Sequence, residues 1–174
     1  MKKCSECGGT MAREVRDHHD TESGLDDVIL RGVTAYRCGS CGTEAVQIRA
    51  IEKLHQAIAD ELAAKPSRLI PAEVKFLRGH LGLTNKAFAD LMGVSAEQAS
   101  RWTSSEPMGM PAEHLLRMFA ILGPEAFSES PTLPAAVFGR PLLALLSKLP
   151  GIKPQQKIRP IALSQGREGW TAAA

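Results

Sequence analysis

The sequence predicts a mainly α-helical protein with a small β-containing, metal-binding domain at its N-terminus. All four cysteines of the 174-residue chain lie among the first 41 residues, as two Cys-x-x-Cys pairs, Cys4/Cys7 and Cys38/Cys41. Further along the chain, apolar residues recur at helical spacing, and residues 84–103 have the pattern of two short helices joined by a sharp turn.

These patterns divide the chain into four parts. We expect a zinc-finger domain over residues 1–47, a connecting helix over 48–66, a helix-turn-helix domain over 67–123 and a partly irregular C-terminal extension over 124–174. The content of 44% hydrophobic and 23% charged residues is ordinary for a soluble protein. Because no apolar run approaches the length of a membrane span and the N-terminus has no apolar signal region, we expect a cytoplasmic protein without a membrane partner.

The cysteine pairs have the spacing of a structural metal site. Each Cys-x-x-Cys can place two thiolates on one side of a metal ion, and two such pairs complete the closed tetrahedron that is typical of structural zinc. We therefore expect one zinc ion per chain, bound by Cys4, Cys7, Cys38 and Cys41, that holds residues 1–45 folded. The alternatives are disulfides, which would require an oxidising compartment, and a redox Cys-x-x-Cys, which does not need a second copy.

The segment between the cysteine pairs predicts two strands and a loop. Residues 11–15 and 28–37 have the composition and alternation of strands, whereas residues 16–27 are polar and predict a loop. His18 and His19 fall in that loop. With four thiolates available, we expect both histidines to be solvated and not to bind the metal.

Helical periodicity begins after the second cysteine pair. Residues 47–65 carry an apolar stripe at helical spacing, and that helix ends before Pro66. Its stripe either packs on neighbouring helices or is presented to a partner. Pro71 and Pro111 open two further helices, which supply the core that a helix-turn-helix cannot bury alone.

Residues 84–103 contain the start and stop signals of a helix-turn-helix. Thr84 and Ser95 are suited to cap the two helices, and Gly93 can adopt the left-handed conformation that ends the first. A small residue, Ala89, lets the helices cross closely. This joint placement predicts a motif whose second helix enters the DNA major groove, although an ordinary helical hairpin contains similar elements.

The second helix of this motif predicts a DNA-reading face. Arg101 can donate two hydrogen bonds to a guanine edge, and Glu97 can accept one from cytosine. The start of the preceding helix is suited to a DNA phosphate, because helix amides and the helix dipole favour anions. The expected DNA contacts are Thr84, Asn85, Lys86, Ser95, Ala96, Glu97, Gln98, Ser100, Arg101 and Ser104.

Charge is spread unevenly along the chain. Residues 1–50 carry 7 basic and 8 acidic side chains, residues 51–123 carry 8 and 8, and residues 124–174 carry 6 and 3. The helix-turn-helix part therefore lacks the strongly basic footprint of many DNA-binding domains. The proline-broken tail, in which residues 142–149 have the composition of one helix, is either a solvated extension or a basic arm that adds phosphate contacts.

Several short motifs resemble a known family. The helical part resembles the repressor-type helix-turn-helix domains of the XRE (Cro/C1) family through Leu77-Arg78, Leu83-Thr84, Phe88-Ala89, Met92-Gly93-Val94 and Ser100-Arg101-Trp102. Together with the two cysteine pairs, this resembles the MqsA-type antitoxins, which carry a YgiT-type zinc finger. Residues 28–38 resemble the strand that leads into the second cysteine pair of that family.

This resemblance covers about residues 1–123 and implies a DNA-binding autorepressor that is dimeric through its helical domain and binds a toxin through its finger. The chain departs from the family in three places. Trp102 is followed by residues 103–105, Thr-Ser-Ser, where the family often has an acidic residue and then glycine. Glu97 stands where the family can carry a polar neutral residue, and residues 124–174 extend beyond the family's usual end.

We therefore expect a sequence-specific transcriptional repressor that binds operator DNA as a homodimer, and specifically the antitoxin of a type II toxin–antitoxin system that autoregulates its operon. Two alternatives stay open: a zinc-stabilised regulator without a toxin, and an adaptor whose helical domain binds protein. We do not expect an enzyme, because no nucleophile, base and orienting group recur in a recognisable arrangement.

Overall fold

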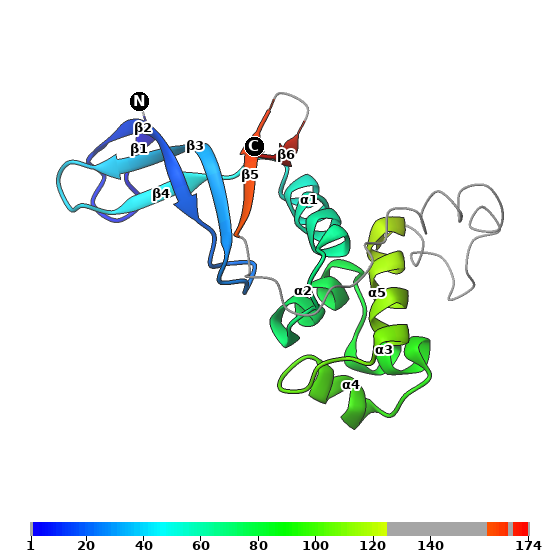
Figure 1. Cartoon of the computed structure of the whole chain (residues 1–174). Helices are drawn as coiled ribbons and strands as arrows, with labels where there is room; N and C mark the ends of the chain where they lie inside the picture. Colours follow the sequence, from blue (N-terminus) through cyan, green and yellow to red (C-terminus); the bar gives the residue numbers. More distant parts are fainter. Residues whose placement is uncertain (1, 125–159, 167–168, 174) are drawn as a thin grey trace. The chain divides into compact units, whose positions relative to one another are not determined.

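The computed structural model describes residues 2–124, 160–166 and 169–173 of the chain (Figure 1). These residues belong to two compact units. The first contains Met1–Glu22, Asp26–Ala57 and Pro160–Ala174, and the second contains Ser23–Leu25 and Ile58–Arg159. The C-terminal residues thus fold with the N-terminal residues, although the helical part of the chain separates the two in sequence.

The prediction of a mainly α-helical protein is wrong. Of the described residues, 39% are helical and 26% lie in strands, so the fold is a mixture of helices and one mixed sheet. Four strands were missed: β1 (Lys2–Lys3), β4 (Glu44–Gln47), β5 (Ile161–Gln165) and β6 (Trp170–Ala172). Each is too short to show a clear alternation of apolar and polar residues, and the last two lie in the proline-rich tail.

The sheet is organised around β3 (Val28–Cys38), its longest strand. One edge of β3 pairs antiparallel with β2 (Thr10–His19), which in turn pairs with the short β1 (Lys2–Lys3). The other edge pairs antiparallel with β4 near the cysteines and parallel with β5 at the far end. β6 returns antiparallel along β5.

β2 extends further than the sequence predicted. His18 and His19, placed by the prediction in a polar loop, lie in β2 and pair with Leu30 and Ile29 of β3. The pairing slips by one residue between Arg16 and His18, which makes a β-bulge. The predicted loop therefore starts later, because the polar residues of this strand face solvent and hide its strand pattern.

Buried apolar side chains attach the C-terminal strands to the sheet. Leu163 of β5 is fully buried and Trp170 of β6 is nearly so, and Leu30 of β3, opposite Leu163, is also buried. The indole Nε1 of Trp170 donates a 3.0 Å hydrogen bond to the carbonyl oxygen of Arg49, which precedes the first helix. Apolar burial and this hydrogen bond give the C-terminal strands a fixed place in the first unit.

Five helices follow in the described part of the chain: α1 (Ile51–Ala64), α2 (Pro71–His80), α3 (Asn85–Met92), α4 (Ala96–Trp102) and α5 (Met110–Leu122). α1 begins four residues later than the predicted start at residue 47, because Glu44–Gln47 pairs with β3 and Ala50 then turns the chain with φ of 49°. Pro71 and Pro111 lie in the first turns of α2 and α5, as predicted. The boundary between the two units falls within α1.

The second unit has an aliphatic and aromatic core. Side chains from all of its helices contribute to it, and almost all of them are completely shielded from solvent. This core includes Ile58, Leu62, Leu69, Val74, Leu77, Phe88, Ala99, Trp102, Leu116 and Phe119.

A buried ion pair on α5 completes that core. Glu113 and Arg117 are both fully buried, and Arg117 Nη2 lies 2.8 Å from Glu113 Oε1. Glu113 also accepts hydrogen bonds from Arg68 Nε (2.6 Å) and the amide of Leu69 (3.1 Å). Arg117 donates to the last carbonyls of α1 and to the segment that follows it, at Leu62, Ala63, Lys65 and Ser67. The pair therefore satisfies carbonyls that a helix end leaves without partners.

Two expectations for the tail lie outside the described residues. These are the helix over residues 142–149 and the basic arm with Lys148, Lys153, Lys157, Arg159 and Arg167. Within the described ranges, no helix has both the length and the apolar character that crossing a membrane requires.

Candidate metal centre and nucleic-acid interface

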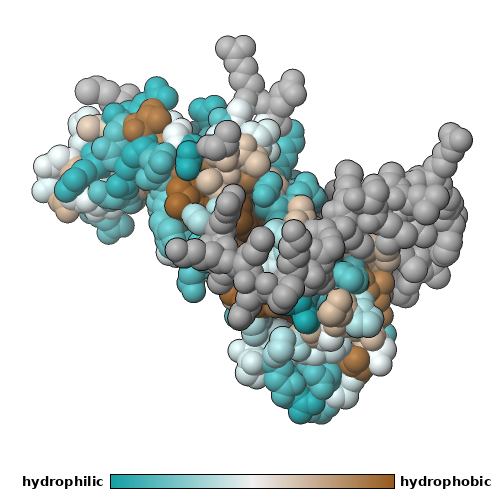
Figure 2. Space-filling model, in the orientation of Figure 1, coloured by the Kyte–Doolittle hydropathy of each residue, from teal (hydrophilic) through white to brown (hydrophobic). Residues whose placement is uncertain are grey.

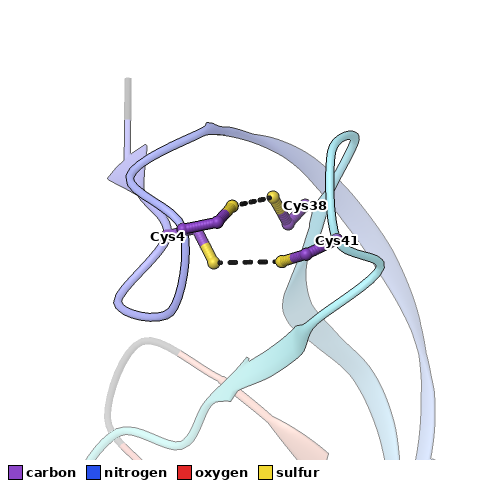
Figure 3. A group of neighbouring side chains, drawn as sticks. Cys4, Cys38 and Cys41 are labelled. Atoms are coloured by element: carbon purple, nitrogen blue, oxygen red, sulfur yellow. Dashed lines mark hydrogen bonds between the residues drawn. The ribbon is translucent and has the colours of Figure 1, made fainter.

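The four cysteines form one cluster, as their spacing predicts. Cys4 and Cys38 are buried, Cys7 and Cys41 are exposed, and all four sulfur atoms lie within 4.8 Å of one another. The Cys4–Cys41 sulfur distance is 3.6 Å and the Cys7–Cys38 distance is 3.4 Å (Figure 3). Four thiolates bound to one ion at about 2.3 Å would have sulfurs about 3.8 Å apart. The cluster is therefore compatible with a structural metal site, and no disulfide links these cysteines.

The two cysteine pairs are built by the same backbone pattern. In the first, the Gly8 amide donates to the Cys4 carbonyl oxygen at 3.0 Å; in the second, the Gly42 amide donates to that of Cys38 at the same distance. Each first cysteine also donates its own amide to a carbonyl five residues later, at Gly9 or at Thr43, both at 2.9 Å. The repeated turn explains how two separate sequence segments present their sulfurs in the same way.

Glycines allow these turns to close. Gly8 and Gly42 have φ of 71° and 75°, a left-handed conformation that residues with a side chain rarely adopt. Gly9 is required for another reason. A Cβ atom on Gly9 would lie 2.8 Å from the Ser40 hydroxyl and 3.2 to 3.3 Å from the sulfurs of Cys7 and Cys38. The absence of a side chain at Gly9 therefore leaves room for the cluster.

Backbone amides favour the thiolate form at three of the cysteines. The amides of Cys7 and Glu6 lower the pKa of Cys4, and the amides of Cys41 and Ser40 lower that of Cys38. The hydroxyl and amide of Thr43 lower the pKa of Cys41, whose sulfur lies 3.1 Å from that hydroxyl.

Cys7 behaves in the opposite way. The Gly9 amide lowers its pKa, but the neighbouring sulfurs of Cys41 and Cys38 outweigh that amide and raise the pKa to about 12. Crowded negative sulfurs make the last deprotonation costly, and a bound cation removes that cost. The electrostatics of the cluster therefore fit a cation-binding site.

Little apolar surface supports this end of the sheet. The buried side chains around the cluster are Cys4, Met11 and Cys38, with Tyr36 and Ala45 packed against them. Lys2 Nζ lies 4.4 Å from the centre of the Tyr36 ring, a cation–π contact. The small size of this cluster means that the cysteine end depends on its sulfurs.

The helix caps predicted for residues 84–103 are confirmed. Thr84 Oγ1 accepts a hydrogen bond from the Ala87 amide at 3.1 Å, and Ser95 Oγ accepts one from Gln98 at 3.2 Å. Gly93 ends α3 with φ of 66° and ψ of 35°, the predicted left-handed conformation. These local signals could be read from the sequence because each depends on one side chain and its neighbours.

α3 and α4 pack through small and aromatic residues. Ala89 of α3 and Ala99 of α4 are buried, and the Phe88 and Trp102 rings meet edge to face at 6.4 Å. Burial of Ala99 and Trp102 fixes which side of α4 faces solvent. Of the predicted contact residues in α4 and the loop after it, Ala96, Glu97, Ser100, Arg101 and Ser104 are exposed and Gln98 is half-buried. Figure 2 shows that the visible surface over α4, at the bottom of the view, is mostly hydrophilic.

The remaining predicted contact residues lie at the start of α3. Thr84 and Lys86 are exposed, and Asn85 is half-buried. The Asn85 side-chain amide donates a 3.0 Å hydrogen bond to the Ala96 carbonyl oxygen, so it links the start of α3 to the start of α4. The structure thus gives Asn85 a packing role that the sequence did not predict.

Glu106 was missed by the sequence reading. Its carboxylate lies 3.4 Å from Arg101 Nε, and Gln98 Oε1 accepts a 2.7 Å hydrogen bond from Arg101 Nη2. The amide of Glu106 also donates to the Arg101 carbonyl oxygen at 2.9 Å. Glu106 lies in a loop outside the helical repeat, so periodicity gave no signal for it.

Glu97 remains charged beside these groups. Its own backbone amide and the Ser95 hydroxyl lower the pKa of Glu97 and outweigh the opposing effect of burial, and the charge of Arg101 adds a smaller lowering. The exposed face of α4 therefore presents one guanidinium between two carboxylates, those of Glu97 and Glu106.

Comparisons with family models, with curated proteins and with solved structures found no match to this chain.

Proposed function

We propose that the protein is a sequence-specific DNA-binding repressor with one structural zinc ion, and that it acts as the antitoxin of a toxin–antitoxin pair. The observation that carries the DNA-binding part is the arrangement of α3 and α4. The two capped helices α3 and α4 cross at small buried residues, and α4 presents Arg101 to solvent.

Zinc is proposed because the four ligands are thiolates in a closed arrangement. Tetrahedral sites with four sulfurs bind zinc or iron, and a site with no open position is typical of structural zinc. Elemental analysis of the purified protein distinguishes the two metals, and a colourless protein with one equivalent of zinc is expected. Oxidised thiols without metal, or an iron absorption band, would contradict the proposal.

The proposed reading helix is α4. Its exposed side contains a bidentate donor, Arg101, and a carboxylate acceptor, Glu97, which are groups that can distinguish base pairs in the major groove. The start of α3, with Thr84 and Lys86 exposed, would contact a phosphate. A homodimer follows from this proposal, because helix-turn-helix proteins commonly bind paired half-sites.

An adaptor that binds protein is the second candidate. The observation in its favour is the charge of the α4 face, where Glu97 and Glu106 flank Arg101 and repel a phosphate backbone. The two candidates therefore predict different salt dependence and different partners for the same surface.

The proposed toxin contact is on the first unit. β1 pairs with β2 only at Thr10 and Met11, so the outer edge of β2 from Ala12 to His19 faces no other described strand. An exposed strand edge can pair with a strand of another protein. Co-expression with the protein encoded next to this gene tests the antitoxin part, and failure of the two proteins to co-purify would contradict it.

A binding titration on DNA tests the central part of this proposal. The full-length, metal-loaded chain is titrated onto its own promoter and onto a scrambled duplex of equal length, at one fixed salt concentration. We expect tighter binding to the promoter, with a footprint of two half-sites. Equal affinity for both duplexes, or no binding to either, would favour the adaptor.

A further inference from the structure

The outer edge of β2 is open along most of its length. One edge of β2 pairs with β3, and β1 covers the other edge only at Thr10 and Met11, with no further strand beyond it in the described part of the chain. The β-bulge between β2 and β3 does not interrupt this outer edge. Asp17 alone lies opposite two residues of β3, so the extra residue of the bulge is on β3 and β2 has none between residues 12 and 18.

Val15 lies at the middle of this open stretch. Its exposed fraction is 63%, the largest among the exposed large apolar residues of the described ranges. The residues beside it are all charged, with Arg13 and Glu14 before it and Arg16 and Asp17 after it. An unpaired strand edge is a template for another strand, and an apolar residue at its centre is stabilised when that strand covers it.

Two copies of β2 can pair about a two-fold axis only in certain registers. In an antiparallel pair, two residues that lie opposite each other either both point their N–H and C=O groups at the partner strand or both point them away. These groups alternate along an edge, so a residue cannot lie opposite its neighbour in sequence. The two-fold axis must therefore place one residue of β2 opposite its own copy.

Charge selects the register that has Val15 at its centre. With Val15 opposite its own copy, Arg13 lies opposite Asp17 of the second copy. Glu14 likewise lies opposite Arg16 of the second copy, so every charged pair across the interface joins opposite charges. A register centred on any one of these four charged residues would place two like charges directly opposite each other, which is destabilising.

The side chains of Arg13 and Asp17 are exposed and have hydrogen-bonding groups left for a second copy. Arg13 Nη2 donates to Thr34 Oγ1 at 3.5 Å, and Asp17 Oδ1 accepts from the Gly32 amide at 3.0 Å. A guanidinium has several donors and a carboxylate has a second acceptor oxygen, so each group can also bond across the interface. Such charged pairs select the register, whereas hydrogen bonds between the two backbones supply most of the affinity.

Glu14 and Arg16 contribute less to the choice of partner. Within one copy, Glu14 Oε1 lies 3.2 Å from Arg16 Nε, and Arg16 Nη2 also contacts Glu44. These charges already have partners, so a second copy adds little new attraction on this face of the sheet. Arg13 and Asp17 are therefore the residues at which the register is best tested.

We propose that the outer edge of β2 binds a second copy of this chain. The two β2 strands pair antiparallel over residues 12–18, about a two-fold axis at Val15, and join the two sheets into one. This edge is also the proposed toxin contact, so a toxin bound there would displace the second copy. The pairing does not depend on DNA binding, because β2 belongs to the first unit and α4 to the second.

Amide hydrogen exchange of the full-length, metal-loaded protein, measured at low and at high micromolar concentration, detects this pairing. We expect exchange in residues 12–18 to slow as the concentration rises. A dimer formed through the helical unit alone would leave exchange in β2 independent of concentration, and that result would overturn the pairing. Promoter binding with β2 unprotected would overturn only the pairing, whereas β2 protection without promoter binding would overturn only the proposed repressor.

Two variants with opposite charge changes test the register. Arg13→Glu places two carboxylates opposite each other, and Asp17→Arg places two guanidinium groups opposite each other. We expect each variant to weaken self-association by roughly tenfold. When the two variants are mixed in equal amounts, every charged pair between them again joins opposite charges, so β2 should be protected as in the parent protein.

Asp90→Arg is the matched control for this mixture. Asp90 is exposed on α3 in the second unit, and its substitution changes the net charge as Asp17→Arg does. Mixed with Arg13→Glu, it should leave β2 of the Arg13→Glu chain less protected than the Asp17→Arg mixture does. The circular dichroism and metal content of each variant should match the parent. Equal protection in the two mixtures, or self-association of both single variants at the parent's strength, would overturn the register.

A change at the centre of the stretch tests the axis without removing a side-chain hydrogen bond. Val15→Lys places two cations opposite each other on the two-fold axis, and we expect roughly tenfold weaker self-association. Val15→Thr keeps a neutral β-branched side chain and should retain the concentration-dependent protection of β2. Equal self-association of the Val15→Lys and Val15→Thr variants would overturn the central position of Val15.

Discussion

The cysteine end of the first unit and the helical second unit are stabilised by different interactions. At the cysteine end of the first unit, Met11 is the one buried apolar residue of the local cluster other than the cysteines themselves. The second unit buries a continuous set of aliphatic and aromatic side chains and closes it with the Glu113–Arg117 pair. The cysteine end therefore needs a cross-link through its sulfurs, whereas the helical unit contains its own source of stability.

This difference also determines how each unit responds to change. A metal-dependent segment loses the free energy that stabilises its fold when the ligands are protonated or the ion is removed. A packed core with a buried ion pair becomes less stable when one partner of that pair is removed, because the other charge stays buried without compensation. The following predictions separate these two cases.

The largest effect of a single substitution is expected at the buried ion pair. Glu113→Gln leaves Arg117 without a counter-charge in a fully buried position, and we expect the free energy of unfolding of the second unit to fall by about 3–5 kcal/mol. Denaturant unfolding measured by the fluorescence of Trp102, in a Trp170→Phe background, reports on this unit alone. Asp90→Asn on the exposed side of α3 is the control. A loss no greater than that of the control would show that the pair does not support the core.

The cysteine end is expected to be sensitive to the addition of a single methyl group. Gly9→Ala brings a methyl group within 3.3 Å of two sulfurs, and we expect roughly a 10- to 100-fold loss of metal affinity, as for other residues that support metal ligands. Gly39→Ala is the matched control, since a Cβ atom there meets nothing within 4 Å. Competition with a chromogenic chelator measures both affinities. Equal affinities for the two variants would contradict the packing argument.

A third prediction concerns a substitution that changes DNA binding and leaves the stability of the protein unchanged. Arg101→Ala should weaken promoter binding by about 1–3 kcal/mol and relax the preference for one base pair, while the melting temperature stays unchanged. Lys86→Ala should weaken promoter and scrambled DNA alike and reduce the salt dependence. If Arg101→Ala binds both duplexes as the parent does, α4 is not the reading helix.

The smallest effect on the stability of the second unit is expected when the pH is lowered. Burial raises the pKa of Glu113, but hydrogen bonds from Arg68, Arg117 and the Leu69 amide outweigh burial and hold the pKa below its usual 4.5. Glu113 therefore stabilises the second unit above pH 4.5, and this contribution is lost as the pH falls through the lowered pKa. Metal release by protonated thiols should precede that loss, so acid titration should show two transitions. A single transition in which Trp102 and metal content change together would contradict the comparison.

Local features of the structure could be predicted from the sequence, and pairings between distant segments could not. The cysteine cluster and the caps at Thr84 and Ser95 depend on short spacings that the sequence displays directly. β5 pairs with β3 between residues more than 130 positions apart, so no local sequence pattern predicts this pairing. For the same reason the hydrogen bonds from Arg117 to the end of α1 were not foreseen. The contact of Glu106 with Arg101 spans only five residues, but Glu106 lies in a loop outside the helical repeat, so periodicity gave no signal for it.

Amide hydrogen exchange with and without a metal chelator tests the difference between the two units most directly. In the full-length protein, we expect the chelator to abolish protection in β1 and in the cysteine ends of β2 and β3, and to leave the protection of α2, α3, α4 and α5 unchanged. The expectation rests on the small apolar cluster at the cysteines and the large core of the helical unit. Loss of protection in both units together, or in neither, would contradict it.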